Sequence, residues 1–155
     1  KAWDESDDDL NASLWGLRAG MAAKRQGEDA MRRYMPYLLR ARHEERKDLG
    51  DKELLKSLAR QAGLDIAQFE QDLNDRTTLD EIAASHTEAV EEHGVFGTPT
   101  FVFENGTSAF LKVIRPRSPE EAAKAFDSVV DVMQGVVFVG ELKRPQPPWP
   151  KGVFD

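Results

Sequence analysis

Apolar side chains recur every three or four residues through residues 1–93, which predicts a series of amphipathic helices. The start and stop signals agree with this pattern. Asp51 and Asp65 are good N-caps, Gln68 follows Asp65 at capping-box spacing, and Gly63 is placed to end the helix between them. The expected helices span about residues 10–27, 28–45, 51–62, 65–73 and 77–94. We therefore expect residues 1–93 to form one helical region.

Three positions in this helical region carry more specific expectations. Pro36 lies inside the second expected helix and should kink or split it. Leu17 shares the apolar stripe of the first helix, so we expect it to face the core. His86 lies on the apolar stripe of the fifth helix, which predicts a core histidine with satisfied ring nitrogens.

The periodicity changes after residue 94. Thr100 to Glu104 has the composition of a strand, Asn105-Gly106 is a strong hairpin signal, and residues 108–114 form the expected return strand. Apolar residues occupy both faces of this hairpin. A hairpin that is apolar on both faces needs cover on both sides, so we expect helices to sandwich it.

The last expected helix begins with Ser118 as N-cap, Pro119 at the first helical position and Glu121 at N3, and it ends at Gly135. Its expected buried stripe consists of Ala122, Phe126, Val129, Val130 and Met133. Residues 94–135 therefore form an expected ββα part. Residues 136–155 form a proline-rich tail, in which Trp149 docks onto its own domain or serves as a ligand for a partner.

Between the helical region and the hairpin lies the loop Phe96-Gly97-Thr98-Pro99. Proline cannot donate to a sheet ladder, so it belongs at the first residue of a strand, on an edge or at a bulge. Pro99 is therefore either a simple trans-proline strand start or a cis-proline kept for a purpose. For an arbitrary X-Pro bond the cis form has a frequency of only about 5–6%.

The run Gly-Val-Phe-Gly-Thr-Pro-Thr-Phe at residues 94–101 resembles the cis-proline loop of the DsbA-like branch of the thioredoxin superfamily. This branch includes DsbA-type thiol oxidoreductases, FrnE-like proteins, hydroxychromene carboxylate isomerases and kappa-class glutathione transferases. The resemblance extends over roughly residues 13–133. It implies an α/β, thioredoxin-like fold with a helical insertion, here mostly helical with a C-terminal β-hairpin and helix. It also implies that Pro99 is cis and faces the catalytic Cys-x-x-Cys (or Ser) motif.

The departure from the family pattern is that none of the 155 residues is a cysteine. We therefore expect no catalytic residue in this chain. The resemblance implies that Phe96, Gly97, Thr98 and Pro99 bind the substrate. We also expect an N-terminally truncated protein that lacks the βαβ unit with the catalytic motif, so that its sheet is incomplete. A partner chain, or a second copy paired through the exposed hairpin edge to give a homodimer, would then supply the missing strands.

The resemblance implies that the parent protein is a thiol-disulfide oxidoreductase with a protein or small-molecule thiol or disulfide as substrate. Two alternatives stay open. One is an isomerase or a kappa-glutathione-transferase-like enzyme that uses glutathione or another small thiol; otherwise we expect no cofactor. The other is a non-catalytic thioredoxin-like binding module. An upstream Cys-x-x-Cys would favour redox chemistry, a lone Ser or Cys the isomerase or transferase, and no nucleophile the binding module.

The net charge and the spacing of the histidines limit which partners and metal sites we expect. The formal net charge of −7 argues against a nucleic-acid or anionic-membrane partner, and no apolar run has the length of a membrane-spanning helix. The histidines are His43, His86 and His93, and none has a second histidine at the close spacing of a helical metal pair, so we expect no metal site. A cytoplasmic location is expected, because the family branches that the loop most resembles lack export signals.

Overall fold

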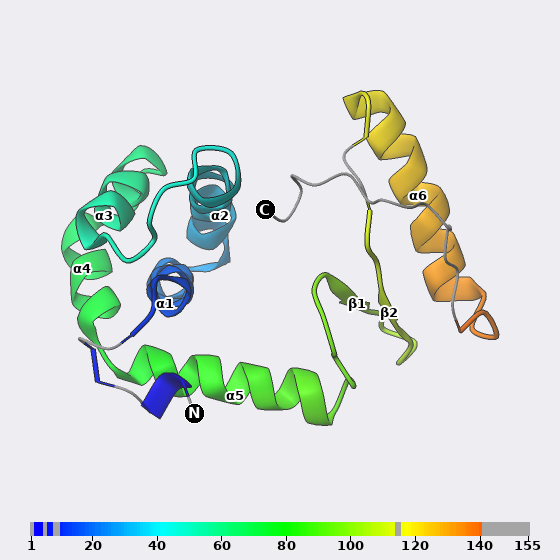
Figure 1. Cartoon of the computed structure of the whole chain (residues 1–155), viewed down its shortest axis with the longest axis horizontal. Coiled ribbons are helices and arrows are strands. Elements are labelled where there is room, and N and C mark those ends of the chain that lie inside the picture. Colours follow the sequence, from blue (N-terminus) through cyan, green and yellow to red (C-terminus); the bar gives the residue numbers. More distant parts are fainter. Residues whose placement is uncertain (1, 5, 8–9, 114–115, 141–155) are drawn as a thin grey trace. The chain divides into compact units, whose positions relative to one another are not determined.

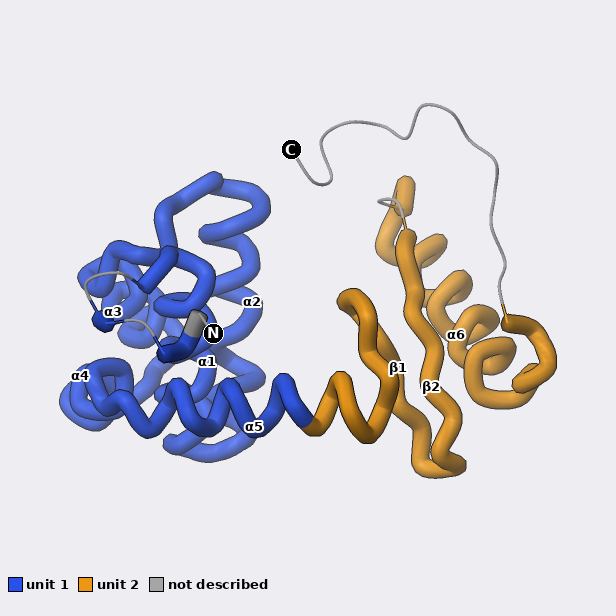
Figure 2. The backbone as a smooth tube through the Cα atoms, turned by 60° about the horizontal axis from the view of Figure 1, so that its bottom comes forward, with its two compact units in different colours: residues 1–87 blue, residues 88–155 orange. Residues whose placement is uncertain are grey.

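The computed structural model describes residues 2–4, 6–7, 10–113 and 116–140 (Figure 1). The chain divides into two compact units, residues 1–87 and 88–155 (Figure 2). The division falls inside the fifth helix, so that helix contributes to both units. None of the described helices is long and apolar enough to cross a membrane.

Unit 1 is built from helices, as the apolar periodicity predicts. A 3-10 turn (η1) precedes α1, and the elements are η1 (Ala2–Asp4), α1 (Ala12–Arg25), α2 (Glu28–His43), α3 (Lys52–Gln61), α4 (Ile66–Asn74) and α5 (Thr77–Glu91). Helix α2 runs unbroken through Pro36, so the expected split does not occur. Pro36 is exposed, and water on this side of the helix can satisfy the carbonyl that loses its helical bond.

The predicted capping residues act as expected in unit 1. The Asp51 carboxylate accepts hydrogen bonds from two first-turn N–H groups of α3, at 2.9 and 3.2 Å. The Asp65 carboxylate accepts one from the Gln68 N–H of α4 at 3.0 Å. Gly63, which follows α3, has a φ of +70°, a left-handed conformation that favours glycine. These local bonds satisfy the helix ends without help from tertiary packing.

One hydrophobic core occupies unit 1, with α1 packed against α2, α3 and α4. The Tyr34 and Phe69 side chains are fully buried, and their ring centroids lie 5.3 Å apart. The Trp15 ring is also buried, and two cations contact it, Arg18 at 4.4 Å and Lys52 at 4.0 Å from the ring centroid. Long and aromatic side chains therefore fix how α1, α2 and α4 pack.

Two core assignments in unit 1 are wrong. Leu17 is 54% exposed, because the buried face of α1 is centred on Leu14, Trp15 and Ala19 instead. His86 is exposed and is not a core histidine. Burial along α5 ends at Ile82, and the ring contact of His86 with Trp3, at 5.2 Å between centroids, leaves the histidine exposed.

A charged cluster joins α1 to α4 and α5. The Arg25 guanidinium donates to carboxylates of Asp72 at 3.2 Å and Asp75 at 2.8 Å, to the Thr77 hydroxyl at 2.6 Å, and to Glu81. Thr77 also donates to Asp75 from its hydroxyl and its backbone N–H. These Thr77 bonds, followed by that from Arg25, lower the pKa of Asp75 to about 2.

Unit 2 contains the predicted hairpin and last helix. Strands β1 (Thr100–Val102) and β2 (Ser108–Phe110) pair antiparallel, and both are shorter than expected. The Asn105-Gly106 turn has its glycine at a φ of +82°. Helix α6 (Pro119–Gly135) contacts β2 and is capped by the Ser118 hydroxyl, as predicted. The last residue of the expected return strand, residue 114, lies outside the described residues, as does the tail segment 141–155 with Trp149.

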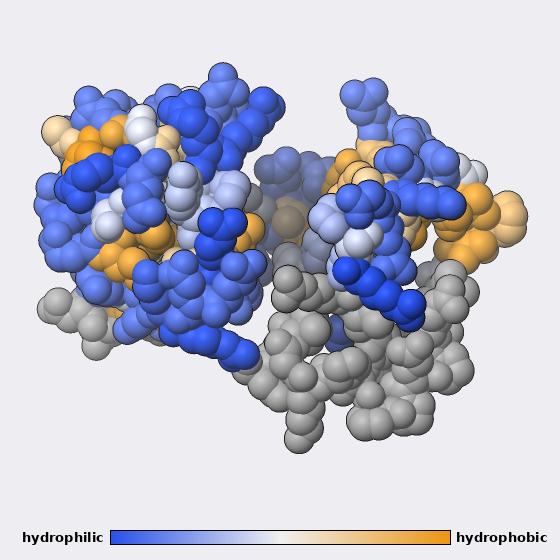
Figure 3. Space-filling model, turned by 90° about the horizontal axis from the view of Figure 1, so that it is seen from above, coloured by the Kyte–Doolittle hydropathy of each residue, from blue (hydrophilic) through white to orange (hydrophobic). Residues whose placement is uncertain are grey.

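Unit 2 differs from the expected sandwich in its burial. No described residue from 88 to 140 is buried, and this includes the whole predicted stripe of α6. Phe126 in α6 is 50% exposed, and on the hairpin Val102 is 45% and Phe110 38% exposed. Figure 3 shows apolar surface on this unit. The expectation of cover on both faces is wrong for the described residues, because α6 is the only helix among them that contacts β2 closely.

Candidate functional site

The loop that carries the predicted site follows directly from the end of α5. The chain leaves the helix through Gly94, whose φ of +63° is a left-handed conformation. The Val95 N–H donates back to the Ala89 carbonyl at 2.9 Å, a bond typical of a glycine-terminated helix. This stop fixes where the loop begins.

The other end of the loop is fixed by the hairpin. The Thr98–Pro99 peptide bond is cis, and the Pro99 carbonyl accepts a hydrogen bond from the Leu111 N–H at 3.1 Å. The Thr100 hydroxyl donates to the Gly97 carbonyl at 2.6 Å. Two carbonyls of the loop are thus bonded on the side that faces the hairpin.

An aromatic pair lies beside this backbone. The Phe96 ring is 83% exposed and its centroid is 5.1 Å from that of Phe110. A Cβ atom on Gly97 would lie 3.0 Å from the Phe110 ring, which is closer than an ordinary contact, so a glycine permits this approach. Thr98 and Pro99 are exposed. The four predicted site residues therefore form one accessible surface.

The chemistry available on this surface is that of binding. It offers the exposed Phe96 ring, the Thr98 hydroxyl and the peptide groups of an extended loop, which suit an apolar side chain next to a peptide backbone. It offers no thiol, because the chain has no cysteine. That these four residues bind substrate stays a prediction.

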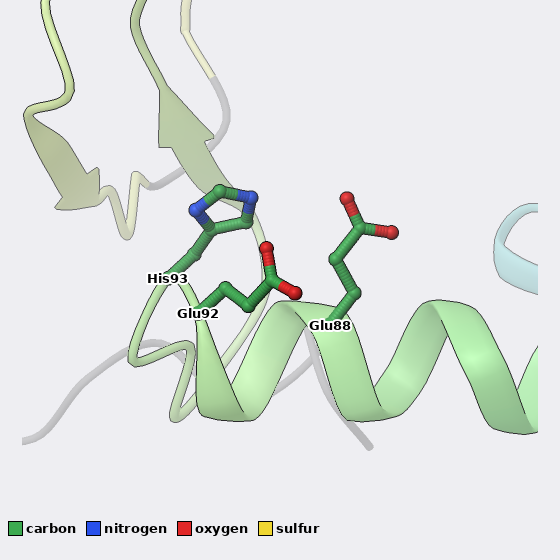
Figure 4. A group of neighbouring side chains, drawn as sticks. All are labelled: Glu88, Glu92 and His93. Atoms are coloured by element: carbon green, nitrogen blue, oxygen red, sulfur yellow. The ribbon is translucent and has the colours of Figure 1, made fainter.

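The structure also brings together three residues that the search for histidine pairs missed. Donor atoms of Glu88, Glu92 and His93 all lie within 4.8 Å of one another at the end of α5 (Figure 4). The spacing Glu-x-x-x-Glu-His was visible in the sequence. It is found only when carboxylates are counted as partners of a histidine, because residues four apart share a helix face.

Comparison with known proteins finds one family model that matches the chain. A family model described as a DSBA-like thioredoxin domain matches residues 4–123, which include α1 to α5, the loop and the hairpin. No individual curated protein matches the chain. The match at residues 4–123 confirms the family resemblance, which was expected from the sequence over roughly residues 13–133.

Proposed function

The chain belongs to the DSBA-like thioredoxin domain family, and on this premise we propose that it is the substrate-binding part of a thiol-disulfide oxidoreductase. In this proposal the loop Phe96-Gly97-Thr98-Pro99 receives the substrate, and a segment outside these 155 residues supplies the reactive thiol. Family membership supports the reaction class, and the accessible loop surface supports the role of this part.

The observation that carries the binding role is the exposure of Phe96 next to a bonded backbone. A phenylalanine that is 83% exposed leaves a large apolar ring in water, and covering it with a ligand is favourable. The carbonyls of Gly97 and Pro99 are already bonded toward the hairpin. An incoming chain would therefore meet a loop whose shape is set before binding, which lowers the entropy cost of recognition.

The proposed chemistry needs a thiol that this chain lacks. A thiolate attacks one sulfur of a substrate disulfide, a mixed disulfide forms, and the other sulfur leaves as a thiolate. A second thiol then attacks the mixed disulfide, which leaves the enzyme oxidised and the substrate reduced. The proposed role of the loop is to align the substrate disulfide with the attacking thiolate. We expect the isolated chain to reduce no disulfide.

The sheet gives a structural reason to place the thiols on a segment that also pairs with this unit. The described part of unit 2 has a two-stranded sheet with large apolar side chains exposed on strand and helix. A two-stranded hairpin is marginally stable by itself in water. A strand–helix–strand segment with a thiol at its helix N-terminus would extend the sheet and bring that thiol to the sheet on which the loop lies.

The absence of cysteine favours one further candidate, a non-catalytic binding module that has a thioredoxin-like loop without its redox chemistry. A relative that uses a small thiol such as glutathione is distinguished from both by its ligand. The two classes of ligand, an extended peptide and glutathione, therefore serve as separate probes in one experiment.

The test is a titration of the full chain, monitored by NMR, with a ten-residue cysteine-free extended peptide and separately with reduced glutathione. We expect peptide-induced shifts at residues 95–100, and about tenfold weaker binding in the Phe96→Ala variant. Phe138→Ala is the matched control, because Phe138 is 88% exposed and lies outside the loop. An insulin-reduction assay on the same chain should show no turnover.

Four results would contradict the proposal. Equal loss of affinity in both phenylalanine variants would mean that binding is not located at the loop. Shifts with glutathione alone would favour the isomerase or transferase relative. If neither probe binds, or if the cysteine-free chain reduces insulin, the proposed substrate-binding role is wrong.

A further inference from the structure

The end of α5 places three metal-ligating side chains on one side of the helix. Glu88 and Glu92 are four residues apart, so they lie one above the other, and His93 follows where the helix has ended. Their donor atoms all lie within 4.8 Å of one another, and Figure 4 shows the three side chains extending from the same side of the helix end. Glu88 and Glu92 are exposed, and His93 is half-buried.

The position of His93 is fixed independently of the two glutamates. Its backbone carbonyl accepts a hydrogen bond from the Ser108 hydroxyl of β2 at 3.4 Å. The residue after it is Gly94, whose left-handed conformation stops the helix. The hairpin and the helix stop therefore hold the histidine at this end of α5, which reduces the freedom that binding would have to remove.

Electrostatics at this helix end favour a bound cation. The C-terminal end of a helix carries a partial negative charge, and cations are favourable there. The last turn of α5 contains no basic residue, as is also true of α4 and α6 but not of α1, α2 and α3. Instead Glu88, Glu91 and Glu92 add negative charge to this end. A divalent cation would offset both the helix dipole and the repulsion between the carboxylates.

We propose that Glu88, Glu92 and His93 form a zinc-binding site at the C-terminal end of α5, although the histidine spacing had predicted none. One imidazole nitrogen and two carboxylate oxygens are a ligand set that Zn²⁺ accepts at about 2.0–2.2 Å. Around a tetrahedral ion such donors lie about 3.5 Å apart, so the side chains must approach by roughly an ångström. The exposure of both glutamates permits this adjustment. A fourth position is left for water.

The predicted effect of zinc is to fix the junction between α5 and the loop. His93 precedes Gly94, and the loop with Phe96 follows two residues later. A metal bound to α5 through the glutamates and to the junction through His93 restrains how the loop leaves the helix. This inference does not depend on the proposed oxidoreductase role.

The test is isothermal titration of the full chain with Zn²⁺, followed by the same titration with Mg²⁺. We expect one zinc per chain and weaker binding of magnesium, which prefers oxygen ligands and keeps its water. The Glu88→Gln, Glu92→Gln and His93→Gln variants should each bind zinc at least about tenfold more weakly, since even outer-shell changes at metal sites cost 10–100-fold. Circular dichroism should show unchanged helicity in the metal-free variants.

Two control variants make the result specific. Glu91→Gln removes the same charge from the same helix turn, and His86→Gln removes a histidine from the same helix; both lie outside the cluster and should retain the zinc affinity. An equal loss in Glu91→Gln would show that acidic charge alone attracts the ion. An equal loss in His86→Gln, equal affinity for Mg²⁺, or no one-to-one zinc binding by the unmodified chain would overturn the site.

Discussion

The two units use the same local signals, but among the described residues only those of unit 1 form a buried core. The buried hydrophobic residues of the described part lie between Leu10 and Ile82 in unit 1, whereas no described residue from 88 to 140 is buried. Yet α6 in unit 2 has an N-cap serine, a proline at its first position and helical length, as good a start as any helix of unit 1. Local capping therefore sets where a helix begins, and it does not determine whether that helix finds a partner.

This difference separates two kinds of sequence signal. A cap and a helical period concern neighbours within one turn, so both units satisfy them. An apolar stripe shows which helix face would be favourable to bury, but not whether a partner covers it. In unit 2 the Phe101 and Phe126 rings lie 6.1 Å apart between centroids, and Phe126 is still half exposed. The apolar surface of unit 2 thus fits a domain whose sheet is completed by further strands, as in the proposed function.

The largest expected difference concerns a phenylalanine in each unit. Phe69 is fully buried against Tyr34, so Phe69→Ala should destabilise unit 1 by about 3–5 kcal/mol through lost burial and a cavity. Phe126→Ala in α6 removes a half-exposed ring and should cost about 0.5 kcal/mol or less. Urea unfolding followed by far-ultraviolet circular dichroism measures both.

The fluorescence of Trp15, which is buried in unit 1, gives a second signal for the same unfolding transition. The contrast between the units is broken if Phe126→Ala shifts the urea midpoint as far as Phe69→Ala does. Such a result would mean that α6 packs against a core of its own in solution.

A smaller effect is expected from removing a cap in each unit. Asp51→Ala deprives the first turn of α3 of its acceptor, and because Leu55 and Leu58 of this helix are core residues, unit 1 as a whole should lose about 1 kcal/mol. Ser118→Ala removes the corresponding acceptor for the Glu121 N–H in α6. Since α6 buries no residue, its loss should stay local.

Native-state amide hydrogen exchange distinguishes these outcomes. Asp51→Ala should speed exchange through the protected core of unit 1 by about fivefold, the equivalent of about 1 kcal/mol. Ser118→Ala should speed exchange only within α6. Faster exchange in β1 and β2 of the serine variant would show that the helix and the hairpin unfold together.

The sequence predicted the elements well because their signals are local. Asp51, Asp65 and Ser118 act as caps, and Asn105-Gly106 forms the turn. Burial was less predictable, because it depends on partners distant in the sequence. Leu17 and His86 lie on continuous apolar stripes but stay exposed, although the His86 ring contacts that of Trp3 in η1 at 5.2 Å between centroids.

In the candidate site, too, local features were predictable from the sequence and long-range contacts were not. The loop from Phe96 to Pro99 was found from its own residues, because the glycines and the proline constrain the backbone locally. The close approach of Phe110 to Gly97 was not predicted, since it depends on the strand register that pairs Thr100 with Phe110. The Glu88, Glu92 and His93 group was missed because carboxylates are so common on helix surfaces that their spacing alone predicts little.

The smallest expected effect concerns the pH dependence of stability that comes from one carboxylate at the start of a helix in each unit. Asp75, before α5, has its pKa lowered from 3.8 to about 2 by Thr77 and Arg25, and the pKa of Glu120 in α6 is lowered by its own backbone N–H and the Ser118 hydroxyl. A lowered pKa stabilises the folded state above the unfolded value, near pH 4, and this stabilisation is lost as the pH falls toward 2.

The stability advantage of the unmodified chain over Asp75→Asn should therefore be full above about pH 4 and vanish near pH 2. The measurement is urea unfolding at several pH values, in which subtracting the two curves removes the titration of the other carboxylates. Glu120→Gln is the matched control, because Glu120 belongs to a helix without buried residues, and it should leave the unfolding curve of unit 1 unchanged at every pH. A pH-independent gap between the chain and Asp75→Asn would contradict this prediction, because it would show that the ionisation of Asp75 does not contribute to stability. An effect of Glu120→Gln on unit 1 would mean that the two units unfold as one, which removes the contrast between them.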